Sequence, residues 1–203
     1  MVTTEHFGYG QKEVDYLTRA DAKLGAAMAR IGKVEREVMP DLFAALVYAI
    51  VSQLISAKAA RTIRQRMQDK LGAITPRNLA GQQAEAIQSC GVTMKKAECI
   101  RAIACAIEQG EFAIETLREL PDADVIRVLT GLKGIGAWTA EMMLIHALGR
   151  TDVVSWGDIA IRRGMIRLYG LDILDREQFE KYRLVYSPYG SVASIYLWEI
   201  AAE

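Results

Sequence analysis

The sequence predicts an all-α fold, and three observations carry this prediction. The chain of 203 residues holds only four prolines. No stretch alternates apolar and polar residues over the length of a strand, whereas apolar residues recur at the spacing of amphipathic helices. With 51% hydrophobic residues, the chain is able to bury a proper core, either as one domain or as two small lobes.

The composition also indicates a protein of the cytoplasm. No stretch reaches the roughly 18 uninterrupted apolar residues of a membrane span. The N-terminus lacks a basic region followed by an apolar core, so no secretion signal is expected. Cys90, Cys99 and Cys105 form neither a metal-binding nor a disulfide pattern, which is typical of a reduced, intracellular protein.

Net charge is zero, with 25 basic and 25 acidic residues, whereas a dedicated nucleic-acid binder is usually basic. The charges are unevenly distributed, however. Residues 51–70 hold five basic residues and one acidic residue, and residues 171–203 hold six acidic and three basic ones. Each individual charge is equally well explained as part of a solvated helix face.

Periodicity and capping residues place the helices. Residues 13–31 are expected to form a first helix, which Gly32 ends. Pro40 and Asp41 then begin a helix over residues 42–56 that is apolar nearly all round and so belongs in the middle of a domain. Further helices are expected over 57–71, 94–109, 122–131, 137–148, 159–169, 176–187 and 191–202, with a short one opening at Pro76.

The most informative stretch is residues 129–158. Its turn, Leu132-Lys133-Gly134-Ile135-Gly136, has two glycines that permit a positive φ or a close approach of the main chain. A helix capped by Asp122 precedes the turn, and the 137–148 helix follows it. This is a helix-hairpin-helix motif, in which the first amides of the second helix are a site for an anion such as phosphate.

Two segments resemble a known family. The hairpin segment LKGIGAWTA (132–140) and VVSWGDIAIRRGM (153–165) resemble the helix-hairpin-helix (HhH-GPD) DNA glycosylases. The resemblance is to the 3-methyladenine DNA glycosylase II (alkylpurine) branch, in a compact form without the extra N-terminal domain. It extends through 43–60 and 188–198, and so covers most of the chain.

The resemblance implies two helical lobes with a DNA-binding cleft between them. Residues 42–150 would form the lobe with the hairpin, and residues 1–41 plus 151–203 the lobe with the catalytic aspartate. The expected partner is double-stranded DNA that contains damaged bases, and the protein is expected to be a monomer that does not associate with membranes.

Asp158 takes the place of the family's catalytic aspartate. From spacing alone, a helix-capping aspartate is the simpler interpretation, although a carboxylate is able to cap a helix and face a pocket together. Cleavage of an N-glycosidic bond builds positive charge on the sugar, which a carboxylate near C1′ stabilises. Alkylated purines already carry positive charge and are good leaving groups, so one carboxylate could suffice.

The resemblance implies further site residues. Gln53, Trp138 and Tyr189 would line the base pocket, where aromatic faces suit a cationic base. Trp156 lies close enough in sequence to Asp158 to belong there, and Leu54 would be the wedge that fills the gap left by the flipped nucleotide. Gln53 could instead be merely exposed at the end of its helix, and each aromatic could be ordinary core.

The remaining expectations concern DNA and ions. The DNA backbone would be held by Lys133, Gly134, Gly136, Thr139 and Arg162. A Na⁺ or K⁺ ion would bind the main-chain carbonyls of Thr130, Leu132 and Ile135. No cofactor is expected to be required, and no iron–sulfur cluster, because no cysteine follows Cys105.

Trp138 also bears on the type of reaction. The relatives that cut the DNA strand have a lysine there, which attacks C1′ and forms a Schiff base. Tryptophan implies a monofunctional enzyme that leaves an abasic site. Two departures from the family pattern lie near the pocket: Trp156-Gly157 stands where Pro-Asp is common, and Gly190 where arginine is frequent.

Two other functions remain open from the sequence. The chain could be a non-catalytic helix-hairpin-helix module that only holds DNA, which would release no base from any lesion. It could also be a glycosylase for oxidised, deaminated or mismatched bases, which a panel of lesions would separate from an alkylpurine enzyme.

Overall fold

The computed structural model describes residues 4–203, and the described chain is built almost wholly of helices, as the sequence predicts. The helices fall into two compact units. The hairpin unit consists of residues 39–148 with the described residues up to Glu5, and the Asp158 unit consists of residues 6–38 and 149–203. A small two-stranded sheet, β1 (Glu5–His6) with β2 (Glu37–Val38), is the one addition to the all-α prediction within residues 4–203.

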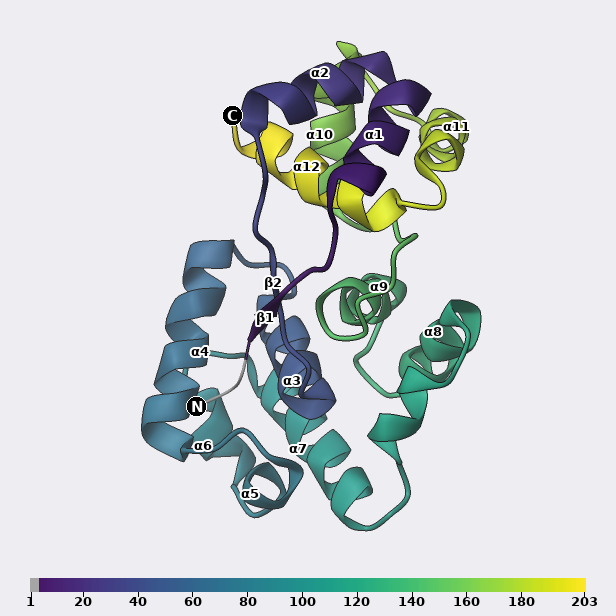
Figure 1. Cartoon of the computed structure of the whole chain (residues 1–203). Coiled ribbons are helices and arrows are strands. Elements are labelled where there is room, and N and C mark those ends of the chain that lie inside the picture. Colours follow the sequence, from purple (N-terminus) through teal and green to yellow (C-terminus); the bar gives the residue numbers. More distant parts are fainter. Residues whose placement is uncertain (1–3) are drawn as a thin grey trace. The chain divides into compact units, whose positions relative to one another are not determined.

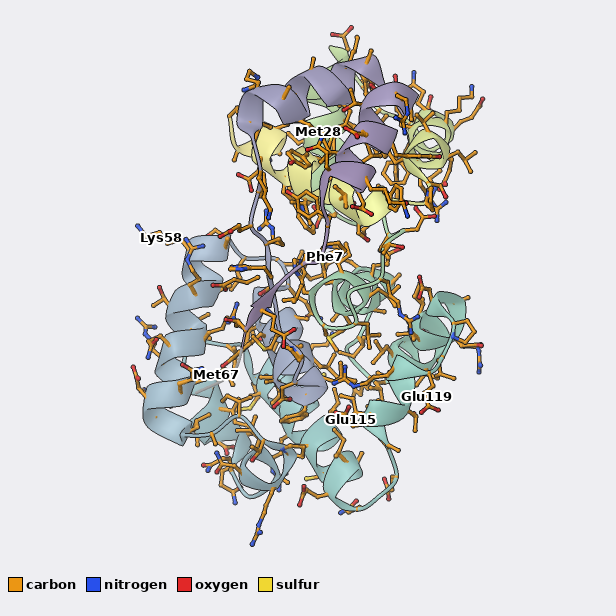
Figure 2. All side chains as sticks on the ribbon, in the orientation of Figure 1. Phe7, Met28, Lys58, Met67, Glu115 and Glu119 are labelled. Atoms are coloured by element: carbon orange, nitrogen blue, oxygen red, sulfur yellow. The ribbon has the colours of Figure 1, made fainter. Side chains whose placement is uncertain are left out.

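The hairpin unit is organised around α3 (Leu42–Ser52), in which nine of eleven residues are buried. Helix α3 lies between α4 (Ala57–Leu71) and α9 (Ala137–His146) and also packs on α7 (Met94–Glu108) (Figure 1). The inner side of α4 carries the fully buried Met67, while Lys58 projects from its first turn (Figure 2). The other elements of the unit are α5 (Pro76–Ala80), α6 (Ala84–Gln88), a 3-10 helix η1 (Ile114–Arg118) and α8 (Asp122–Thr130).

The Asp158 unit is organised around α12 (Gly190–Ala202), in which ten of thirteen residues are buried. Helices α10 (Ile159–Tyr169), α2 (Ala22–Ile31) and α11 (Arg176–Tyr186) pack on α12, and α1 (Gln11–Ala20) packs on α2 (Figure 1). Met28 of α2 points into this core and is 2% exposed (Figure 2).

Helix limits agree with the sequence where a side-chain oxygen caps the first turn. Thr75, Thr93 and Asp158 each accept a hydrogen bond from a main-chain amide two or three residues ahead. The cap expected at Asp122 is wrong by one residue: Pro121 is the capping position and Asp122 begins α8.

Two expected helices are interrupted. Residues 13–31 form α1 and α2, because Asp21 leaves the helical conformation and its carboxylate accepts a hydrogen bond from the Leu24 amide at 2.9 Å. Residues 42–56 do not form one helix either, since α3 ends at Ser52 and Ser56 caps α4. Among the described residues, no helix is long and apolar enough to cross a membrane.

We expect Gly164→Ala to lower the free energy of unfolding by about 2 kcal/mol or more. An added Cβ would lie 2.2 Å from the carbonyl oxygen of Leu197, so α10 and α12 would have to separate. Urea unfolding measures the change. The matched control is Gly8→Ala, whose Cβ would have nothing within 4 Å and should alter stability by less than about 0.5 kcal/mol. A Gly164 variant as stable as the control would contradict the close crossing.

Candidate functional site

The hairpin turn between α8 and α9 rests on α7. Gly134 has φ +93°, a conformation that favours glycine, and a Cβ there would lie 2.9 Å from the Cys99 sulfur. The Cys99 thiol donates to the Lys133 carbonyl at 3.1 Å, and the buried Ile135 donates its amide to the Leu132 carbonyl at 3.1 Å. Cys99 therefore stabilises the turn, a role that the spacing of the three cysteines does not indicate.

Helix α9 begins directly after the turn, and no side chain caps the main-chain amides of its first turn. Its capping position is Gly136, which has no side chain, and its first turn carries no acidic residue. Gly134 and Gly136 are exposed, as is Lys133 beside them. The start of α9 therefore has no side-chain cap and no acidic residue that would compete with an anion for its first amides, and anion binding there stays a prediction.

Gln53 is bound to the hairpin. It is the C-cap residue after α3, and its side-chain Nε2 donates to the Gly134 carbonyl at 3.2 Å and to the Thr139 hydroxyl at 3.0 Å. A carbonyl only accepts, so the amide must turn its nitrogen toward Gly134. Both Nε2 hydrogens are thereby used, and Oε1 remains as an acceptor.

Leu54 follows Gln53 in a strained conformation. Its φ is +58°, and it is the one residue besides glycine with a positive φ in the described chain. Its side chain is 99% exposed, and Ile55 beside it is 38% exposed. A leucine in this conformation destabilises the folded state by about 1 kcal/mol or more, and its exposed side chain contributes no hydrophobic burial to offset this.

Lys96 binds the main chain immediately before Leu54. From the first turn of α7, its Nζ donates to the Gln53 carbonyl at 2.7 Å and to the Val51 carbonyl at 2.9 Å. Burial lowers the pKa of Lys96. Sequence reasoning did not assign Lys96 to the site, and its one local signal is a cation in the first turn of a helix, where the helix dipole disfavours it.

Trp138 lies in the first turn of α9, half-buried, next to the buried Thr139. The hairpin unit thus brings together three of the expected site residues: Gln53 and Leu54 at the end of α3, and Trp138 at the start of α9. The expected cation ligands, Thr130, Leu132 and Ile135, lie at the end of α8 and in the turn of the same unit.

Asp158 is the capping residue of α10. Its Oδ1 accepts from the amides of Ala160 at 2.8 Å and Ile161 at 3.0 Å, and the residue is only 6% exposed. Its own amide donates to the carbonyl of the fully buried Ser155. The capping interpretation is therefore correct, and the two amides also fix the orientation of the carboxylate.

Trp156 contacts a cluster of side chains in the Asp158 unit. Its ring meets Phe179 edge-on at 5.1 Å between centroids. The guanidinium carbons of Arg162 and Arg176 lie 4.9 and 5.2 Å from the ring centre. These contacts hold the half-buried ring against α10 and α11, a set of neighbours that the sequence did not predict.

Tyr189 lies at the start of α12, after a cis peptide bond between Ser187 and Pro188. Its half-buried ring meets Tyr16 edge-on at 5.2 Å between centroids. Asp152 fixes this loop, since it accepts from the Ser187 hydroxyl at 2.6 Å and the Gly190 amide at 3.1 Å.

Steric crowding explains why residue 190 is glycine. A Cβ there would lie 2.7 Å from Asp152 Oδ1 and 2.8 Å from a methyl group of Val154. A larger side chain would displace Asp152 from the loop, so the departure from arginine at this position follows from local packing. Across residues 4–203, no group of three or more His, Cys, Asp or Glu side chains is placed to hold a metal ion.

The structure thus defines an almost wholly helical protein that carries a glycine-rich helix-hairpin-helix and a buried aspartate at a helix start. The sequence pattern of the HhH-GPD superfamily of base excision DNA repair proteins matches residues 47–187. The chain belongs to this superfamily.

Known proteins are similar over most of the chain. DNA-3-methyladenine glycosylase 1 of Schizosaccharomyces pombe is 32% identical over 159 residues, which cover 76% of this chain and 70% of that protein. A solved structure of the S. pombe 3-methyladenine DNA glycosylase with abasic DNA has a TM-score of 0.85 at 28% identity, over 93% of this chain and 95% of that one. A solved structure of a DNA-3-methyladenine glycosidase from Bacillus halodurans has a TM-score of 0.78 at 34% identity, over 98% of this chain and 92% of that one.

We expect Leu54→Asn to raise the free energy of unfolding by about 1 kcal/mol, because asparagine tolerates the left-handed conformation and no buried contact is lost. Urea unfolding measures the gain. In the control Leu184→Asn, an equally polar change at an exposed leucine of α11, stability should fall by about 0.5 kcal/mol because asparagine is a poorer helix former. A loss of stability at position 54 would contradict the strain.

Proposed function

We propose that this protein is a DNA glycosylase that flips alkylated purines, of the 3-methyladenine and 7-methylguanine type, out of double-stranded DNA and hydrolyses their N-glycosidic bond. The observation that carries the proposal is the buried, doubly hydrogen-bonded Asp158 in a chain 32% identical to a DNA-3-methyladenine glycosylase. We further propose that it acts as a monomer in the cytoplasm.

Asp158 is the proposed catalytic residue. As the base leaves, positive charge develops on the sugar, and a carboxylate near C1′ stabilises that charge or orients the attacking water. The amides of Ala160 and Ile161 hold the carboxylate in one orientation, so it does not need to reorganise during the reaction. The alkylated base departs without its positive charge, and no general acid is required to protonate it.

We propose that Gln53, Trp138 and Tyr189 contact the flipped base. Electron-rich rings stabilise a cationic base through cation–π contact, by about 2 kcal/mol when water is excluded. Because Nε2 of Gln53 is bonded to the hairpin, the group left for the base is the Oε1 acceptor. This acceptor suits the N–H groups of an alkylated purine.

Trp156 and Arg162 are proposed at the edge of this site. The contacts of Trp156 with Phe179 and two arginines support a role in forming the pocket wall rather than in stacking on the base alone. Arg162 would place its positive charge near a DNA phosphate, and its stacking on Trp156 restricts where that charge can go.

The hairpin is the proposed grip on the DNA backbone. The amides around Gly134, Gly136 and Thr139 would bind a phosphate with Lys133 beside them. Leu54, exposed and projected by its left-handed conformation, would enter the stack and offset part of the unstacking cost.

A Na⁺ or K⁺ ion is proposed at the carbonyls of Thr130, Leu132 and Ile135. Main-chain oxygens suit a hard cation, and the end of α8 provides carbonyls that lack partners within the helix. The Leu132 carbonyl also accepts the Ile135 amide, which leaves one lone pair for an ion. The ion would stabilise the turn, and the chemistry at Asp158 does not need it.

We expect Asp158→Asn to reduce the rate of base release at least about 100-fold, because asparagine keeps the helix cap and removes the charge. The measurement is single-turnover release from duplexes with 7-methylguanine, 3-methyladenine, hypoxanthine or 8-oxoguanine. Unfolding and DNA affinity of the variant serve as controls and should stay near wild type. Unchanged release by the variant would remove Asp158 from the mechanism, and no release of any base by the wild type would favour a non-catalytic DNA-binding module.

Borohydride treatment during turnover should trap no covalent protein–DNA adduct, because Trp138 offers no amine to form a Schiff base. Denaturing gels of the reaction with lesion DNA detect such adducts, and a glycosylase with a catalytic lysine is the positive control. An adduct on the wild-type protein would overturn the monofunctional assignment and point to another nucleophile.

A further inference from the structure

Leu54 makes no packing contact that could hold it in place, since its side chain is 99% exposed at a φ of +58°. A strained conformation persists only when the surroundings over-determine it. The restraint must therefore come from the main chain around Leu54 and from its neighbours. Side-chain hydrogen bonds link the turn formed by residues 53–55 to Lys96 and to the hairpin.

We propose that Lys96 is a positioning residue for the wedge, which holds the 53–55 turn so that Leu54 stays projected for insertion into DNA. The inference rests on the proposed function, because it assumes that Leu54 enters the base stack.

The first support is the pair of bonds from Lys96. Its Nζ, on α7, reaches the carbonyls of Val51 and Gln53 at 2.9 and 2.7 Å. The last carbonyls of a helix have no partner within it, so a cation there both satisfies them and complements the helix dipole. Bonds from an ionised donor are also the stronger kind. The Gln53 carbonyl belongs to the peptide group that joins Gln53 to Leu54. Lys96 therefore fixes the orientation of the peptide plane that precedes Leu54.

The second support is the side chain of Gln53. Its Nε2 bonds to the Gly134 carbonyl and the Thr139 hydroxyl tie the same residue to the hairpin. Gln53 is therefore fixed at its carbonyl by α7 and at its amide by the hairpin. These two attachments set the position of Leu54 relative to the hairpin amides, which are the proposed phosphate grip.

The third support is that the position is unfavourable for a lysine in other respects. A cation in the first turn of α7 opposes the dipole of that helix, and the first turn holds no acidic residue to offset it. Burial also lowers the pKa of Lys96. The adjacent Lys95 is exposed and has the same charge and the same helix turn, so it is a matched control.

A double-mutant cycle tests the proposal. The variants are Lys96→Met, Leu54→Ala, the two combined, and Lys95→Met. Each is assayed for single-turnover base release, for fluorescence of a 2-aminopurine beside the lesion, which reports unstacking, and for DNA affinity. Lys96→Met should lower both the rate of base release and the extent of unstacking about 10-fold. The DNA dissociation constant should change less than about 2-fold. Lys95→Met should match wild type in all three.

The combined variant decides the mechanism. If Lys96 acts through Leu54, the double variant is no worse than Leu54→Ala alone. Lys96→Arg, which can still donate to two carbonyls, should recover most of the lost rate. Should Lys96→Met fail to fold, Lys96→Gln enters the same cycle with the same criterion.

Two outcomes overturn the proposal and are distinguishable. The role of Lys96 is rejected if the rate losses of Lys96→Met and Leu54→Ala multiply in the double variant. It is also rejected if Lys96→Met has no effect while Leu54→Ala slows base release. Both results leave the proposed function intact. No effect of Leu54→Ala on unstacking rejects the wedge itself, and with it the part of the proposed function on which this inference rests.

Discussion

The two hydrogen bonds that Asp158 accepts from Ala160 and Ile161 are the interaction on which the Asp158 unit depends. They set the first residue of α10, which then crosses α12 so closely at Gly164 that no Cβ would fit. The same bonds immobilise a carboxylate before any substrate arrives, which is the condition for electrostatic stabilisation of a developing positive charge. One side chain thus serves the fold and the proposed chemistry.

The hairpin unit meets a different requirement. A wedge of the kind proposed for Leu54 must be exposed and apolar, so its own contacts cannot fix its position. The unit holds Leu54 by a strained main chain and supplies the restraint from elsewhere, through the Gln53 amide and the Lys96 ammonium. The strain at Leu54 is offset by hydrophobic burial elsewhere in the unit, where α3 buries nine of its eleven residues.

The sequence predicted the fold best where local chemistry determines it. The helices that Thr93 and Asp158 cap begin at the expected residues 94 and 159, because a capping oxygen acts only within its own first turn. At the errors over 13–31 and 42–56, contacts between segments act together with the caps at Asp21 and Ser56. The break at Asp21 accompanies close packing of Gly25 against Thr18, and the end of α3 is fixed by bonds from α7 and the hairpin. Neither contact leaves a periodic signal in the chain.

The site residues divide in the same way. Resemblance alone named Gln53, Leu54, Trp138 and Asp158, whereas Lys96 was missed because its acceptors lie 45 and 43 positions earlier in the sequence. The neighbours of Trp156 were missed as well, since Trp156 lies in the turn before α10 whereas Phe179 and Arg176 lie on α11.

By itself, then, the sequence determined the helical class, most helix starts and the glycine turn, because hydrophobic period, caps and glycine conformation all act over a few residues. Only the tertiary structure decided where α3 stops, which way the Gln53 amide turns and what holds Leu54 in its left-handed conformation. Those depend on hydrogen bonds between segments far apart in the chain, which form only when the packed core has brought the partners together.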